Sequence, residues 1–122
     1  MNLNHGRSLV FYRTEKGQCP VDDFLDALPS RVAQKVTWVL KLVQELDIVP
    51  TQYFKKLTDT DEIWECRMVF GGNTYRILGF FHGSNSVVLT HGFMKKTPKT
   101  PAAEIRKAEE LKADYIRRHR RA

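Results

Sequence analysis

Cationic side chains interrupt the part of the sequence that is richest in strand-forming residues. Arg67 and Arg76 stand inside two apolar runs, and Lys95 and Lys96 follow a third. A phosphodiester gains negative charge on its equatorial oxygens in the transition state of cleavage, and fixed cations can stabilise that charge without a metal. Arginine suits this task because its guanidinium is planar and always charged. We therefore treat these four residues as candidate catalytic groups for chemistry on a phosphate.

Structural roles for the same residues stay open. Arg67 and Arg76 could each form a cross-strand ion pair with Glu65 or another acid, and lysines are commonly just solvated. Further basic residues are candidate RNA contacts, namely Lys55, Lys56, Lys99, Arg117 and Arg118.

Glu65 and His91 are the candidate acid or base groups, with Lys56 as a further possible base. Glu65 could instead pair with Arg67. His91 shares the alternating pattern of Val87, Leu89 and Phe93, which favours a buried, hydrogen-bonded histidine over a catalytic one.

The positive charge is concentrated at the C-terminal end. Residues 1–94 carry ten basic and ten acidic residues, whereas residues 95–122 carry ten basic and four acidic ones, which accounts for the whole net charge of +6. A basic segment of this density favours a polyanionic partner. A solvated helix face with a ragged tail is the simpler alternative.

The hydrophobic pattern predicts a single α+β domain over residues 1–122, with flexible ends at 1–7 and 119–122. The expected order is β-α-α-β-β-β-α. The expected elements are a strand at 8–13, helices at 20–28 and from about 30 to 46, a loop at 51–62, three strands joined by two hairpins, and a helix from 101 to about 118.

Two hairpins occupy the centre of this order. Gly71-Gly72-Asn73 closes the first and residues 82–85 close the second. Trp64, Cys66 and Met68 alternate with Glu65 and Arg67, so the apolar set predicts a core face and the polar set an open face. The strand after Gly72 is apolar on both faces apart from Arg76, and it is expected to be the central strand.

Several classes of function have no signal. Cys19 and Cys66 are too few and too far apart for a zinc site, the histidines are scattered, and no glycine-rich loop precedes a helix. We therefore expect no metal and no cofactor. The longest apolar runs are only a few residues, and the first residues lack the apolar core of a secretory signal, so we expect a cytoplasmic protein without a membrane partner.

The combination of LT and IWECR, then NTYRIL, then HGFMKKTPKTP before a basic helix resembles the RelE/HigB-type toxins of bacterial toxin–antitoxin systems, in their phage-derived HigB-like branch. The resemblance covers roughly residues 9–116. It implies a small, largely antiparallel sheet flanked by helices and ribosome-dependent endoribonuclease cleavage of messenger RNA. It also implies a helix-turn-helix antitoxin as partner. The toxin would contact operator DNA only as part of its complex with that antitoxin.

Residue by residue, the resemblance implies that Arg76 contacts the scissile phosphate. It also implies that Arg67 corresponds to the family's arginine on the preceding strand. Lys95 and Lys96 match the basic cluster after the last strand. The chain departs from the family where other members have a proton-transferring lysine pair and a base-stacking tyrosine. Two alternatives therefore stay open: a ParE-like toxin that inhibits gyrase by protein contacts, and a basic nucleic-acid-binding protein without catalysis.

Overall fold

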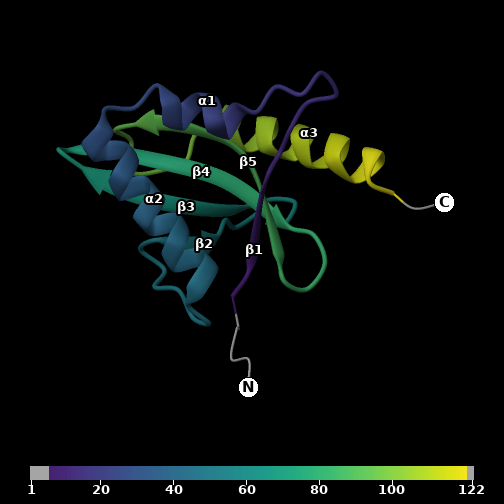
Figure 1. Ribbon diagram of the computed structural model, residues 1–122, viewed down its shortest axis with the longest axis horizontal. Coiled ribbons are helices and arrows are strands. Elements are labelled where there is room, and N and C mark those ends of the chain that lie inside the picture. Colours follow the sequence, from purple (N-terminus) through teal and green to yellow (C-terminus); the bar gives the residue numbers. More distant parts are fainter. Residues whose placement is uncertain (1–5, 121–122) are drawn as a thin grey trace.

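The fold places one mixed sheet between two layers of helices. The structure is a computed structural model, which describes residues 6–120. The elements follow the chain as β1 (Ser8–Phe11), α1 (Pro20–Asp26), α2 (Ser30–Glu45), β2 (Phe54–Lys56), β3 (Trp64–Phe70), β4 (Asn73–Phe81), β5 (Ser86–Lys95) and α3 (Ala102–Arg118) (Figure 1). The predicted α+β class is confirmed. The expected flexible residues 1–5, 121 and 122 lie outside the described part.

The strand order is β1-β5-β4-β3-β2, with β1 parallel to β5 and all other pairs antiparallel. The prediction that the strand after Gly72 is central is therefore confirmed. Gly71 and Gly72 close the first hairpin with positive φ angles of 58° and 81°, a conformation that glycine adopts without steric cost.

The sequence did not predict β2. Residues 51–62 were expected to form a loop, but Phe54–Lys56 pairs antiparallel with Lys55 opposite Glu65. The strand is only three residues long, and two of them are lysines, so it carries no apolar alternation that could be recognised. This edge strand brings two cations against the sheet.

The larger core lies between the sheet and α1 with α2. Val21, Val36, Val39 and Val43 pack there against residues that include Cys66, Met68 and Ile77, which confirms the predicted core face of β3. Gly92 permits close packing of α1: a Cβ placed there would lie 2.4 Å from Cδ2 of Phe24.

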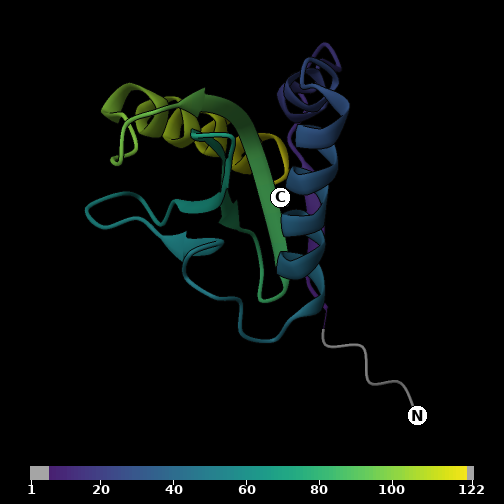
Figure 2. The ribbon, with the colours of Figure 1, turned by 90° about the vertical axis from the view of Figure 1, so that its left-hand side faces the viewer.

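The opposite face of the sheet is covered by α3, as Figure 2 shows. Ile105 and Ala108 pack with Leu57, Leu78 and Phe93, and Leu111 and Tyr115 pack with Phe80 and Val88. The prediction that the Glu65 face is open is therefore wrong where α3 covers it. The apolar stripe predicted for α3 is the face of the helix that packs there.

A bulge in β5 changes which residues share a face. Leu78 lies opposite His91 whereas Gly79 lies opposite Leu89, so Thr90 is an extra residue. Leu89 consequently packs towards α2 and Phe93 towards α3. The shared face predicted for His91, Val87, Leu89 and Phe93 is wrong, because one inserted residue reverses the alternation.

Candidate nucleic-acid interface

A polar hollow of about 260 Å³ opens between β2 and the segment that precedes α3. Three candidate lysines from the sequence analysis line it together with one buried carboxylate. The lining residues are Lys55, Lys56, Leu57, Thr58, Glu65, Pro98, Lys99, Thr100 and Ile105. The fold thus brings Lys99 to the lysines of β2, although more than forty residues separate them in the chain.

The cations around the hollow are only partly neutralised. Lys56 Nζ lies 3.3 Å from an oxygen of Glu62. Lys55 and Lys99 form no ion pair among residues 6–120, and neither do the exposed Lys95 and Lys96 at the end of β5. An uncompensated group of this kind attracts anions.

Arg67 adds a cation beside the same edge of the sheet. Its backbone N–H donates to the carbonyl oxygen of Tyr53 just before β2, at 2.9 Å. The side chain is half-buried, and its Nε is buried without a hydrogen-bond partner in the described part of the chain. A buried donor without a partner costs free energy, so an incoming anion would relieve the cost.

Arg76 is fully buried, unlike Arg67. Its Nε lies 3.3 Å from Glu65 Oε2, and its Nη2 donates to the carbonyl oxygens of Thr97 at 2.7 Å and Pro98 at 3.2 Å. Burial lowers the pKa of Arg76, the Glu65 carboxylate raises it, and the nearby Arg67 lowers it. The alternative of a cross-strand pair with Glu65 is thus the arrangement found for Arg76. Its direct contact with a phosphate stays a prediction that requires the segment above it to open.

The two candidate acid or base groups are also buried. Glu65 accepts a hydrogen bond from the hydroxyl of Thr100 in addition to its ion pair with Arg76. The alternative pairing of Glu65 with Arg67 is not found. The roles of Glu65 and His91 in proton transfer stay predictions, and neither side chain reaches solvent in this arrangement.

His91 has the hydrogen bonds that its pattern predicts. Its Nε2 lies 3.0 Å from Oε1 of Glu104 and its Nδ1 lies 3.1 Å from Oγ1 of Thr90. In the neutral ring, Nε2–H donates to the carboxylate. The Thr90 hydroxyl lies 3.1 Å from both Nδ1 and the carbonyl oxygen of Leu78, and its single hydrogen can be donated to only one of them. Burial lowers the pKa of His91, while the hydrogen bond with Glu104 partly offsets this.

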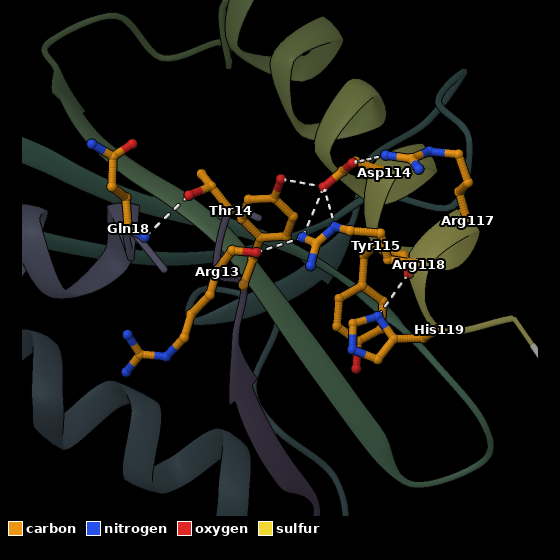
Figure 3. A network of polar contacts seen from close by, with 9 residues as sticks. Arg13, Thr14, Gln18, Asp114, Tyr115, Arg117, Arg118 and His119 are labelled. Atoms are coloured by element: carbon orange, nitrogen blue, oxygen red, sulfur yellow. Dashed lines mark hydrogen bonds and ion pairs between the residues drawn. The ribbon is translucent and has the colours of Figure 1, made fainter. Parts of the chain in front are cut away.

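Arg117 and Arg118 belong to a separate network at the end of α3 (Figure 3). Both pair with Asp114, which also accepts a hydrogen bond from the hydroxyl of Tyr12. The bonds from Arg118 and Tyr12 hold the pKa of Asp114 below its usual range. Arg118 donates further to the carbonyl oxygen of Arg13, so it joins α3 to the segment that follows β1, and its predicted RNA contact competes with that role. The guanidinium of Arg117 stays largely exposed.

Thr100 is the residue of the site that the sequence did not reveal. Its partner Glu65 lies 35 positions earlier in the chain, and nothing in the local KTPKTP pattern distinguishes this hydroxyl from that of Thr97. Only the fold joins them.

The other side of the sheet carries a shallower and wider hollow, of about 560 Å³. Trp38 and Phe70 are 43% and 36% exposed there, and Arg31, Gln34 and Lys35 complete the lining. Large aromatic side chains at the surface commonly mark a protein contact.

The described part of the chain contains neither a candidate metal site nor a helix that could span a membrane. Residues 6–120 contain no group of three or more side chains placed to hold a metal ion. The helices found in this range are too short or too polar to cross a membrane.

Residues 23–113 match the family model described as phage derived protein Gp49-like (DUF891). This range includes β2 to β5, both arginines and all the lysines around the hollow. No curated protein matches the sequence.

Proposed function

The chain belongs to the family of phage-derived Gp49-like proteins, a group of toxin–antitoxin toxins, and from this premise we propose that it is a ribosome-dependent endoribonuclease that cleaves messenger RNA. The observation that supports this most strongly is the set of unpaired cations on one side of the sheet. Lys55 and Lys99 line the hollow, and Arg67 lies outside that lining, on β3 opposite Arg76. None of the three forms an ion pair with an acid among residues 6–120. RNA offers the phosphates that such a surface binds.

In the proposed reaction the ribose 2′-hydroxyl attacks the adjacent phosphorus in line. A base takes the hydroxyl proton, the bond to the 5′-oxygen breaks, and an acid protonates that leaving oxygen. The products are a 2′,3′-cyclic phosphate and a 5′-hydroxyl end. Arg67 stabilises the charge on the equatorial oxygens, and the lysines at the hollow carry the two proton transfers.

The ribosome fits this proposal because the attacking group is the 2′-hydroxyl of the message itself, so the rate depends strongly on how the message is positioned. Holding a message in the in-line geometry can supply several kcal/mol of the activation barrier, about 7–11 in the best-oriented model reactions. A message in the decoding site is already held in place. The protein then acts in the cytoplasm, and its basic C-terminal helix contributes phosphate contacts to ribosomal RNA.

An antitoxin is the partner that the family suggests. We propose a helix-turn-helix protein with an acidic segment that covers the lysines around the hollow, so that the toxin meets operator DNA only within that complex. Charge complementarity would make the association fast and dependent on salt.

The proposal is tested with purified ribosomes carrying a defined message. Cleavage is expected on the ribosome-bound message and absent on the free message. Arg67→Gln should lower the rate about 10²–10³-fold, whereas Arg31→Gln, on the opposite side of the sheet, should leave it unchanged. Binding of RNA without cleavage would favour the non-catalytic alternative and contradict the nuclease.

A ParE-like toxin is the second candidate, and the exposed Trp38 and Phe70 favour it. A toxin that inhibits gyrase through protein contacts would use such an aromatic surface. Trp38→Ala would then abolish growth arrest while Arg67→Gln would not. The nuclease proposal predicts the reverse result.

A further inference from the structure

The segment between β5 and α3, which carries Lys96 and Lys99, is bound from below by a buried guanidinium. Arg76 projects from β4 beneath this segment, and its side chain has no exposed surface. Its hydrogen bonds go to the carbonyl oxygens of Thr97 and Pro98, and Nη1 lies 3.5 Å from that of Lys95. Every acceptor of Arg76 on the segment is therefore backbone, and these contacts fix its path rather than one side chain.

A second contact fixes the far end of the segment. Glu65 on β3 is 2% exposed, and its Oε2 both pairs with Arg76 and accepts the hydroxyl hydrogen of Thr100. One carboxylate thus connects β3, β4 and the residue before Pro101. Within the segment itself, the hydroxyl of Thr97 donates to the carbonyl oxygen of Lys99, at 2.9 Å.

These contacts also determine which residues face each other across the hollow. Lys55 lies directly opposite Glu65 in the sheet, so the carboxylate that binds Thr100 lines the hollow beside the lysines of β2. Lys99 is adjacent to Thr100 in the chain and lines the same hollow. Release of Thr100 would allow Lys99 to move away from Lys55 without disturbing the strands.

We propose that Glu65, Arg76 and Thr100 are positioning residues that hold residues 96–100, and with them Lys99, across the hollow from Lys55 and Lys56. Arg76 has no exposed surface, and Glu65 and Thr100 line the hollow; all three act on RNA binding by holding the segment. The inference rests on the proposed function for its meaning. The contacts of Glu65, Arg76 and Thr100 with the segment, which we call the clamp, can be measured without RNA. It differs from the phosphate contact that the sequence predicts for Arg76.

Thr100→Val is the sharpest variant because it keeps the shape of the side chain and removes one hydrogen bond. Thr58→Val is the matched control, since Thr58 lines the same hollow and its hydroxyl forms no hydrogen bond among the described residues. Backbone order parameters of residues 96–100 should fall from about 0.85 towards 0.6 in Thr100→Val and Glu65→Gln. They should stay unchanged in Thr58→Val. Unchanged order in both clamp variants would overturn the proposal.

A double-mutant cycle separates positioning from direct contact. Affinity for a single-stranded RNA oligonucleotide is measured by fluorescence anisotropy for Thr100→Val, alone and in a Lys96→Ala/Lys99→Ala background. We expect a loss of about threefold to tenfold in the first case and less than twofold in the second, because residues that act through one another are not additive. Equal losses in both backgrounds would contradict the proposal.

The two proposals fail in different ways. A wild-type protein that binds RNA and shows the expected cycle but cleaves no ribosome-bound message contradicts the nuclease and leaves the clamp intact. A protein that cleaves messages normally with a disordered segment contradicts the clamp and leaves the nuclease intact.

Discussion

Arg67 and Arg76 lie directly opposite each other on β3 and β4, yet only Arg76 has a carboxylate partner. Glu65 stands two residues from Arg67 on the same strand and turns to Arg76 and Thr100 instead. Two like charges on facing positions of adjacent strands repel each other. One arginine is therefore part of the framework, and the other has no carboxylate partner among residues 6–120.

This difference predicts that replacing the two arginines has unequal effects on the free energy of unfolding. Arg76→Gln should lower the free energy of unfolding by about 3–5 kcal/mol, because it leaves Glu65 as an uncompensated buried charge. Arg67→Gln should change it by less than about 1 kcal/mol, since it removes a repulsion and an unpaired donor. Denaturant unfolding of the two variants provides the comparison. Equal losses would mean that Arg67 is structural as well.

Gly92 should not tolerate a methyl group. A Cβ there would meet the Phe24 ring at 2.4–2.7 Å, so α1 or the ring must move. Gly92→Ala is expected to cost about 1–3 kcal/mol, and a Phe24→Leu change should recover part of the loss. Thermal unfolding of the single and double variants measures both effects. If the stability losses of Gly92→Ala and Phe24→Leu simply add in the double variant, the contact between these two residues is not the cause.

His91 should make stability depend on pH in the weakly acidic range. Because burial lowers the pKa of the folded histidine below its ordinary 6.5, the unfolded chain takes up the proton first as the pH falls. Stability is therefore complete above about pH 6.5 and decreases below it. Among the charged groups acting on the ring, Glu104 opposes this shift and Lys107 adds to it.

Unfolding free energies at pH 7 and 5.5, for the wild type and His91→Gln, measure this dependence. The wild type should lose more stability than the variant between the two values. Equal pH slopes would show that His91 titrates normally in the folded state.

The two arginines at the end of α3 should differ in their effect. Arg118→Ser breaks an ion pair and a hydrogen bond to the carbonyl of β1's neighbour Arg13, so it should loosen the helix and lower the melting temperature. Arg117→Ser removes only an exposed pair and should change stability by less than about 0.5 kcal/mol. Ribosome affinity over a salt series then measures the phosphate contact of Arg117. An unchanged salt slope in Arg117→Ser would assign that side chain to solvent.

The elements with long apolar periodicity were predictable from the sequence, and the short or interrupted ones were not. The five buried valine and leucine positions of α2 and the glycine turn before Asn73 follow from local pattern. The three residues of β2 carry no such pattern, and the bulge at Thr90 reverses an alternation that looked continuous. Both depend on pairing with a distant strand.

The candidate site follows the same division. The residue types that attract phosphate could be found because lysine and arginine interrupt apolar runs. Which arginine is neutralised could not be found, because it depends on where Glu65 and Thr100 meet in three dimensions. The burial of Glu65 beneath the residues that precede α3 also depends on a contact between chain segments far apart in sequence.

The most direct test of the nuclease is a map of 5′-hydroxyl ends on cellular messages after induction of the protein. The nuclease proposal predicts new 5′-hydroxyl ends inside translated reading frames for the wild type and for Arg31→Gln. For folded Arg67→Gln it predicts that these ends appear about 10²–10³-fold more slowly. Growth arrest by the wild type without new ends, or equal ends with Arg67→Gln, would contradict it.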